Sequence, residues 1–271
     1  MLHFPTVMVG GPVRDREWAV PMWLGGLSCQ DYRGDVRLAV LVNDSVDGTL
    51  DACRWWADNG RWSRAQVNVL NWGCPTDNNV RRDRDYLQFA RARDAWTCMR
   101  DDDVEWLLQV DSDVQLPADT LSRLIELATD HDVKVLAACI QNAWGAPNFA
   151  GNVMICPSGY PEPMHWPGFL SDRSPGVKPC DLTGAAVLIH RDVYDAGITY
   201  VLPDVGLETE DGPFCQACIA AGYQPHYAPS IWATHWMQAP VSTAYLSDTR
   251  YHQQMADWHA HRAKELDHAA G

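Results

Sequence analysis

Short apolar runs alternate with stretches of helical spacing over the first two thirds of the chain. This alternation is typical of a largely parallel β-sheet covered by helices, so it predicts an α/β fold with strands and helices in strict succession. The predicted strands are residues 6–9, 36–42, 67–70, 106–110 and 133–140. The predicted helices are residues 16–28, 49–59, 84–99 and 116–130, the last with Pro117 in its first turn.

The pattern changes after Gln141. Residues 142–179 are rich in glycine, proline and aromatic residues, and a segment of this kind and length predicts a long loop or lid. Order returns with a strand at 185–190, a helix at 212–221 and a short strand at 225–227. Residues 242–268 again have helical spacing, and we expect them to form a C-terminal helix that packs across the body.

The balance of charges limits the kinds of molecule that the protein can bind non-specifically. With 21 Lys and Arg against 35 Asp and Glu, the formal net charge is -14, which opposes non-specific binding to nucleic acid or to an anionic membrane. The sequence has no apolar run of ~20 residues, and it does not start with a basic segment followed by an apolar one. We therefore expect no membrane span, no secretion signal and a cytoplasmic location. The nine cysteines are expected to be reduced core thiols.

Asp111-Ser112-Asp113 is the most informative short motif in the chain. It follows an apolar run at 105–110 that predicts a buried strand. Alternate residues at a strand end can direct both acids towards one cation, and carboxylate oxygens suit Mg²⁺ or Mn²⁺ that carries a diphosphate. The tripeptide alone is a weak signal because Asp-x-Asp is common in turns. The neighbouring acidic run at 101–103 is interpreted as a solvated turn.

Three segments upstream offer groups that suit a nucleotide. Gly10 would let the backbone approach a phosphate or a base closely, and Arg14 can pair with an anion. The carboxylate of Asp44 can accept a hydrogen bond from the N–H of a base, whereas Asp47 is interpreted as a helix cap that needs no ligand. Arg93, on the predicted inward face of its helix, could orient Asp111 or a phosphate, and a plain helix-surface arginine explains it equally well. The segments are residues 9–17, 43–49 and 90–95.

A fourth set of residues follows the predicted loop. Glu210 and Asp211 open a predicted helix, and a Pro-Ser strand leads to His235. A carboxylate at a helix N-terminus stays ionised and can take a proton from an acceptor hydroxyl. His235 can complete the coordination of an ion held by Asp113. Taken singly, helix capping and a core histidine are the better explanations of these residues.

Together these motifs resemble the GT-A fold glycosyltransferases, especially family 2, over roughly residues 5–236. The resemblance implies one three-layer α/β/α sandwich with a mostly parallel central sheet. It implies that Asp211 is the catalytic base, that Glu210 holds the acceptor, and that Asp113, His235 and Asp111 contact the metal. Asp94 departs from the family pattern, which usually has Asn there. The implied nucleotide-sugar contacts are Gly10, Pro12, Arg14, Asn43, Asp44, Arg93, Asp111, Ser112, Thr183 and Gly184.

The resemblance also implies an activity. It is the Mn²⁺- or Mg²⁺-dependent transfer of a sugar from a nucleoside diphosphate donor, of UDP or GDP type, to a hydroxyl acceptor on a glycan, a protein or a modified DNA base. A side-chain base implies direct displacement with inversion. We expect residues 1–115 to bind the nucleotide sugar, residues 116–240 to bind the acceptor and the metal, and residues 241–271 to be a helical extension.

Four alternatives stay open. A retaining relative would use the same positions to bind substrate without removing the proton. Transfer to a hydroxylated base of DNA uses the same nucleophile but is disfavoured by the acidic charge. A nucleotidyltransferase acting on sugar phosphate would need a basic glycine-rich loop, and residues 9–16 contain no lysine. A non-enzymatic carbohydrate-binding protein would suit the 13 tryptophans but leaves the acidic motifs unexplained.

Overall fold

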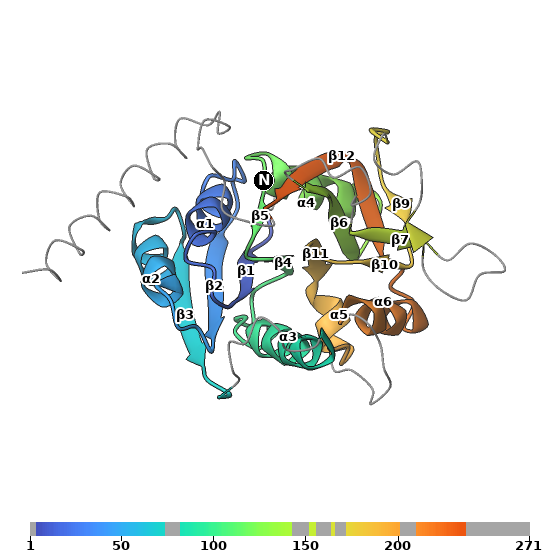
Figure 1. Cartoon of the computed structure of the whole chain (residues 1–271). Coiled ribbons are helices and arrows are strands. Elements are labelled where there is room, and N and C mark those ends of the chain that lie inside the picture. The colour runs from blue at the N-terminus through green and yellow to red at the C-terminus, as the bar shows by residue number, and fades with distance from the viewer. Residues whose placement is uncertain are drawn as a thin grey trace, which may run out of the picture.

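The computed structural model describes residues 4–73, 82–142, 152–155, 164–165, 172–200 and 210–236. The strands of its main sheet are β1 (Val7–Val13), β2 (Val36–Asn43), β3 (Arg64–Leu70), β4 (Trp106–Val110), β5 (Val114–Gln115), β6 (Val135–Asn142), β9 (Lys178–Pro179), β11 (Ala186–His190) and β12 (His226–His235). They lie in the order β3-β2-β1-β4-β11-β6-β12-β5, with β9 paired to β12 (Figure 1).

The sheet is mostly parallel. β1 pairs in parallel with β2 and β4, and β2 pairs in parallel with β3. β11 is inserted between β4 and β6 in the antiparallel sense, and β6 is parallel to β12. A second, three-stranded sheet is formed by β7 (Val153–Ile155), β8 (Met164–His165) and β10 (Leu182–Thr183).

Helices cover both faces of the main sheet, which gives three layers (Figure 1). One face packs against α1 (Val20–Ser28), α2 (Thr49–Asn59) and α4 (Thr120–Asp130). The other face packs against α3 (Arg82–Thr97), α5 (Arg191–Asp195) and α6 (Asp211–Ala220). The expected three-layer α/β/α fold with a mostly parallel sheet is therefore confirmed.

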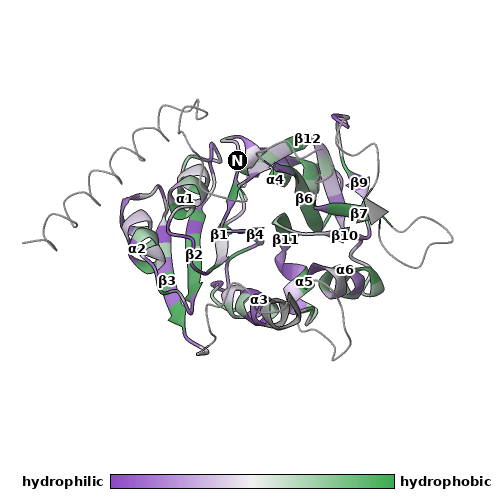
Figure 2. Ribbon diagram, in the orientation of Figure 1, coloured by the Kyte–Doolittle hydropathy of each residue, from purple (hydrophilic) through white to green (hydrophobic). Residues whose placement is uncertain are grey.

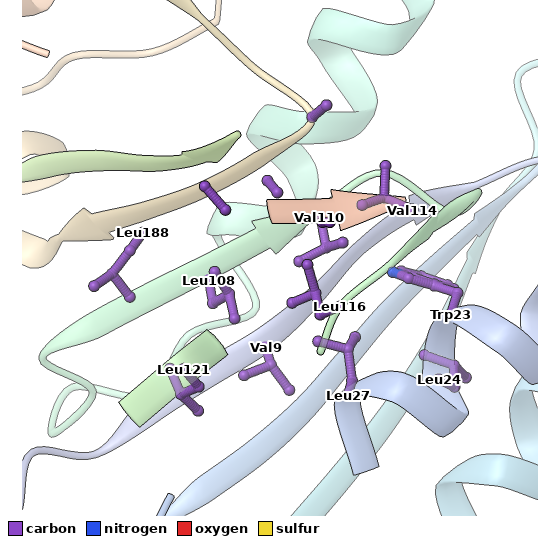
Figure 3. Close-up of a cluster of buried hydrophobic side chains, with 14 of the residues drawn as sticks. Val9, Trp23, Leu24, Leu27, Leu108, Val110, Val114, Leu116, Leu121 and Leu188 are labelled. Atoms are coloured by element: carbon purple, nitrogen blue, oxygen red, sulfur yellow. The ribbon is translucent and has the colours of Figure 1, made fainter. Parts of the chain in front are cut away.

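The core explains why the apolar runs form strands. Hydrophobic residues concentrate in the central strands (Figure 2), and successive residues of one strand enter different layers. In β4, Leu108 and Val110 pack in the layer of α1, whereas Leu107 packs in the layer of α3. Figure 3 shows the first of these layers, where Trp23 lies among leucine and valine side chains of neighbouring elements. A strand buried on both faces reads as a continuous apolar run.

Several predicted boundaries were wrong for identifiable reasons. β1 continues to Val13 rather than ending at residue 9, because Gly10 fits between its neighbours where a side chain would not: a Cβ there would lie 2.0 Å from the carbonyl oxygen of Ala39. α1 begins at Val20 rather than at residue 16, because Pro21 has no N–H for an upstream carbonyl. α4 begins at Thr120, after Pro117 rather than around it.

The predicted strand at 225–227 is the start of the ten-residue β12. Its register against β6 shifts between Ala228 and Trp232, a stretch that includes Pro229, which cannot donate to the ladder. The described parts of the expected loop contain β7, β8 and β9. The rest of that loop, and the expected C-terminal helix at 242–268, lie outside the described residues. Among the described helices, none is long and apolar enough to cross a membrane.

Candidate functional site

The candidate site lies where β1, β2 and β4 end. These strands are parallel, so their carboxyl ends meet at one edge of the sheet, which is where open α/β sheets bind ligands. The N-terminus of α6 and the end of β12 reach the same edge through the contacts described below. Residues from distant parts of the sequence are thereby brought together.

Arg93 of α3 is the centre of the site. Its guanidinium is 1% exposed and pairs with three carboxylates. Nη2 lies 3.0 Å from Asp111 Oδ1 and 3.0 Å from Glu210 Oε1, and Nη1 lies 3.4 Å from Asp211 Oδ1. Glu210 is the N-cap residue of α6, but its side chain makes no capping hydrogen bond. The helix-capping interpretation of Glu210 was therefore wrong, and its pairing with Arg93 replaces it.

Tyr200, which the sequence analysis did not identify, packs against the Arg93 guanidinium. The guanidinium lies 5.3 Å from the centre of the Tyr200 ring, and the ring stacks on Phe214 of α6 at 4.2 Å. Asp94 Oδ1 accepts a hydrogen bond of 2.6 Å from the backbone N–H of Tyr200. Asp94, the position where the family usually has Asn, thus uses its side-chain oxygen as an acceptor, which either residue can supply.

The cluster holds more negative than positive charge. Burial raises the pKa of Asp211 to about 8, with Arg93 opposing the shift and Glu210 and Asp111 adding to it. Burial likewise raises the pKa of Asp111 to about 6. One guanidinium cannot neutralise three carboxylates, of which one is buried and two are partly buried, so one of them retains a proton near neutral pH. A carboxyl poised near the working pH suits a general base.

Gly184 makes room for Asp211. A Cβ at position 184 would lie 2.0 Å from Asp211 Oδ2 and 2.4 Å from its carboxyl carbon. The segment is held by Asn152, another residue that the sequence analysis missed. Its amide nitrogen donates to the carbonyls of Gly184 (2.7 Å) and Ala138 (2.8 Å). Thr183 is 2% exposed in β10. Gly184 and Asp211, 27 positions apart in sequence, are thus in direct contact.

Asp113 and His235 form a second pair. His235 Nε2 lies 3.2 Å from Asp113 Oδ1, and its Nδ1 lies 3.0 Å from Asn142 Oδ1. Because Asn142 Oδ1 only accepts, Nδ1 carries the hydrogen and Nε2 is left to face Asp113. Burial lowers the pKa of His235, but the hydrogen bond to Asp113 and the negative charges of Asp113 and Asp111 together outweigh it, so the pKa lies above its usual value. The backbone N–H of Trp236 donates to the Asp113 carbonyl at 2.8 Å and fixes the strand end.

This pair fits a divalent cation. A carboxylate and a neutral imidazole that face each other need a proton or a cation between them, and adjacent ligands of an octahedral ion with bonds of ~2.1 Å are about 3 Å apart. In the described part of the chain, no three His, Cys, Asp or Glu side chains gather into a metal-binding group. Asp111 is turned to Arg93, so its predicted metal contact stays a prediction. A metal here would take two protein ligands and complete its shell from substrate and water.

The loop after β2 leaves one carboxylate oxygen unused. Asp44 Oδ1 accepts a hydrogen bond of 2.9 Å from the N–H of Gly73, whereas Oδ2 is buried and has no hydrogen-bond partner among the described residues. Asp47 Oδ1 accepts from the N–H of Thr49 at 3.0 Å, but the N-cap residue of α2 is Gly48 and not Asp47 as expected. Asn43 is buried at the end of β2. A buried carboxylate oxygen without a partner is costly, which suits a donor group that arrives with a ligand.

The remaining predicted contacts lie nearby with different roles. Gly10 and Pro12 are buried inside β1 and pair with β2, so they belong to the sheet and not to a loop after it. Arg14 follows β1 and donates from Nη1 to Gln88 Oε1 at 3.2 Å. Ser112 is buried in the turn between β4 and β5. Their predicted contacts with a nucleotide stay predictions.

No protein-family model and no curated protein matches the sequence. Solved structures do match. The S. aureus protein TarS, residues 1–349 in complex with UDP-GlcNAc, superposes with a TM-score of 0.57 at 18% identity, over 93% of this chain and 65% of that one. The mannosyltransferase PcManGT from Pyrobaculum calidifontis, in complex with GDP-Man and Mn²⁺, superposes with a TM-score of 0.58 at 17% identity, over 97% of this chain and 65% of that one.

The match to TarS 1–349 without ligand covers 60% of that chain, so this chain spans less than two thirds of the length of these proteins. At such low identities the likeness shows the fold. The arrangement of sheet and helices is the GT-A arrangement of these glycosyltransferase structures.

Proposed function

Because the chain has the GT-A fold, we propose that it is a glycosyltransferase, which moves a sugar from a nucleoside diphosphate donor to a hydroxyl acceptor with the help of a divalent cation. The observation that carries the proposal is the placement of the Asp113–His235 pair at the same sheet edge as the Arg93 carboxylate cluster. One group suits a cation and the other suits proton transfer. The GT-A structures in complex with UDP-GlcNAc and with GDP-Man and Mn²⁺ support a donor of UDP or GDP type.

On the donor side, Asp44 Oδ2 accepts a hydrogen bond from an N–H of the base, which satisfies its unpaired oxygen. Asp113 and His235 hold the cation, Mn²⁺ or Mg²⁺. When bound, the cation neutralises the negative charge of the departing diphosphate. Asp111, fixed by Arg93, contacts the donor ribose or a water of the cation shell. Thr183 and Gly184 lie against the sugar.

On the acceptor side, Asp211 is the base. Its carboxylate takes the proton of the acceptor hydroxyl while the oxygen attacks the anomeric carbon. The new carbon–oxygen bond forms as the bond to the diphosphate breaks, and the electron pair leaves with the diphosphate. Attack opposite the leaving group inverts the anomeric centre. Glu210 positions the acceptor, and Arg93 keeps Asp211 and Asp111 in place for the two substrates.

The alternatives differ in how much of the site they use. A retaining transferase would not use Asp211 to remove the acceptor proton, so the raised pKa of Asp211 would have no role in its reaction. A carbohydrate-binding protein without activity would use neither the cation pair nor Asp44. A modified DNA base as acceptor is disfavoured by the net charge of -14. We therefore favour an inverting enzyme that acts on a glycan or protein hydroxyl, and a cytoplasmic location is part of the proposal.

The metal site is tested by isothermal titration of UDP and of GDP with and without MnCl₂. We expect Asp113→Ala and His235→Ala each to abolish the Mn²⁺-dependent part of nucleotide binding, because each removes one of two protein ligands. His226→Ala is the matched control, because it removes a histidine from the opposite end of β12. Tight, Mn²⁺-dependent binding by both Asp113→Ala and His235→Ala would show that the cation lies elsewhere.

A further inference from the structure

Asp113 has a second positively charged neighbour besides His235. Arg16 Nε lies 3.7 Å from Asp113 Oδ2, while His235 Nε2 lies 3.2 Å from Asp113 Oδ1. The two carboxylate oxygens thus face two different groups. The Arg16 side chain is 41% exposed, whereas the Asp113 side chain is 16% exposed. The arginine therefore approaches the pair from the solvent side.

The backbone of Arg16 is fixed independently of its side chain. Its N–H donates to Thr49 Oγ1 at 2.8 Å, and its carbonyl accepts from the N–H groups of Ala19 (2.8 Å) and Val20 (3.0 Å). These bonds join the turn before α1 to the start of α2. A change of the Arg16 side chain leaves them in place. The side chain is long and partly exposed, and its Nη1 donates to the carbonyl of Asp15 at 3.2 Å. Leaving Asp113 therefore costs it one partly exposed ion pair.

A cation between Asp113 and His235 would conflict with Arg16 where it stands. The guanidinium would face a divalent charge that shares its carboxylate, and like charges this close repel each other. The donor diphosphate, bound to the same cation, would offer the guanidinium several anionic oxygens. Arginine pairs with phosphate oxygens through charge-assisted and often bidentate hydrogen bonds.

We infer that Arg16 competes with the divalent cation for Asp113 and moves to the donor diphosphate once cation and nucleotide are bound. The inference rests on the proposed function and deepens it, since it assigns a diphosphate-binding residue. Arg16 makes the site weak for the metal alone and strong for the metal with nucleotide. If the Arg16–Asp113 ion pair only joined the turn before α1 to the turn after β4, removing it would not affect metal binding and nucleotide binding in opposite directions.

The test compares Arg16→Gln with the parent in two measurements. Binding of MnCl₂ alone is followed by the electron paramagnetic resonance signal of free Mn²⁺, and binding of UDP and of GDP is followed by calorimetry at saturating MnCl₂. We expect Mn²⁺ alone to bind Arg16→Gln about 2- to 5-fold more tightly, the size of a partly exposed ion pair. We expect the preferred nucleotide to bind about 10-fold more weakly, because a charge-assisted contact is lost.

Two further variants sharpen the comparison. Arg16→Lys retains the charge but not the bidentate geometry, so Mn²⁺ alone should bind it about as it binds the parent, and the nucleotide should bind it more tightly than it binds Arg16→Gln. Arg61→Gln removes an exposed arginine that precedes β3, the outermost strand of the sheet on the side away from β12. It should change neither the Mn²⁺ affinity nor the nucleotide affinity. Circular dichroism of each variant confirms that the fold is retained.

The outcomes separate the two claims. If the parent binds Mn²⁺-nucleotide but Arg16→Gln leaves both affinities unchanged, or weakens both, the inference is wrong and the proposed function stands. If the parent binds neither Mn²⁺ nor the nucleotides, the proposed function fails and this inference fails with it.

Discussion

At the scale of single residues, the site is dominated by the unequal charges around Arg93. Its guanidinium faces Asp111, Glu210 and Asp211, and no described contact brings a second cationic side chain to this cluster. Burial of charge without full compensation costs stability. The same cluster holds the pKa of Asp211 in a range that suits proton transfer. Neutral side chains in its place would make the fold more stable but would remove this function.

The adjacent acids are expected to have different roles. Asp211→Asn keeps the size of the side chain but removes its basicity, so sugar transfer should fall about 100-fold or more while donor affinity changes little. Glu210→Gln should chiefly raise the acceptor KM, because Glu210 is assigned to positioning. Steady-state kinetics of both variants decides. A dead Glu210→Gln beside a fully active Asp211→Asn would exchange the two roles, and two active variants would favour a retaining mechanism.

The pH dependence of transfer follows from the raised pKa of Asp211. The base must be ionised in the free enzyme, so kcat/KM should rise with pH and level off above about 8. The groups that face Asp211 are Arg93, Glu210, Asp111 and the buried Tyr200. The rise should be absent from the residual activity of Asp211→Asn. A parental profile that is flat between pH 6 and 9, or that falls, would remove Asp211 as the titrating base.

At the scale of elements, the sequence predicts those strands that form a continuous apolar run and those helices that show a helical period. The runs at 36–42 and 106–110 became β2 and β4 almost residue for residue. The two-residue strands β5, β8 and β9 were missed, because pairs such as Val114–Gln115 have no period of their own and are strands only through their partners. Gly10 was predicted only as a ligand contact, and its part in close strand packing was not foreseen.

The same distinction holds for the site. Three site residues were identified because each stands in a short motif that can be recognised from the sequence without the structure: Arg93, Asp113 and His235. Tyr200 and Asn152 were missed, since their roles depend on contacts with residues 106 positions before and 32 positions after them. The joint order of motifs predicted which residues meet. The expectation that Arg93 orients Asp111 is matched by their contact of 3.0 Å.

The close contact between β10 and α6 gives a prediction at this scale. Gly184→Ala should displace the Asp211 carboxylate, because the new Cβ would lie 2.0 Å from Oδ2. Transfer should fall at least about 10-fold, since small misplacements of a catalytic group are costly. Mn²⁺-dependent nucleotide binding should be retained. In the double variant with Asp211→Asn the two losses should not add, because both act on one group. Fully additive losses would show that Gly184 acts independently of Asp211.

At the scale of the whole molecule, one edge of one sheet gathers the site from most of the described chain. Its residues range from Arg16 to His235, and strands from both expected halves join the same sheet. The division at residue 115 stays a prediction. Because the cation pair joins the turn after β4 to the end of β12, it exists only when the sheet is complete. Cation and nucleotide should therefore stabilise the whole fold by mass action.

The most direct test of the account is release of diphosphate from UDP-, GDP- and dTDP-sugars by the parent protein, with MnCl₂ and with the metal removed by EDTA. We predict release of UDP or GDP from at least one donor with Mn²⁺, loss of that release with EDTA, and the same loss in Asp113→Ala. Release that persists at the full rate in EDTA, or no release from any donor with Mn²⁺ present, would contradict the proposed metal-dependent sugar transfer.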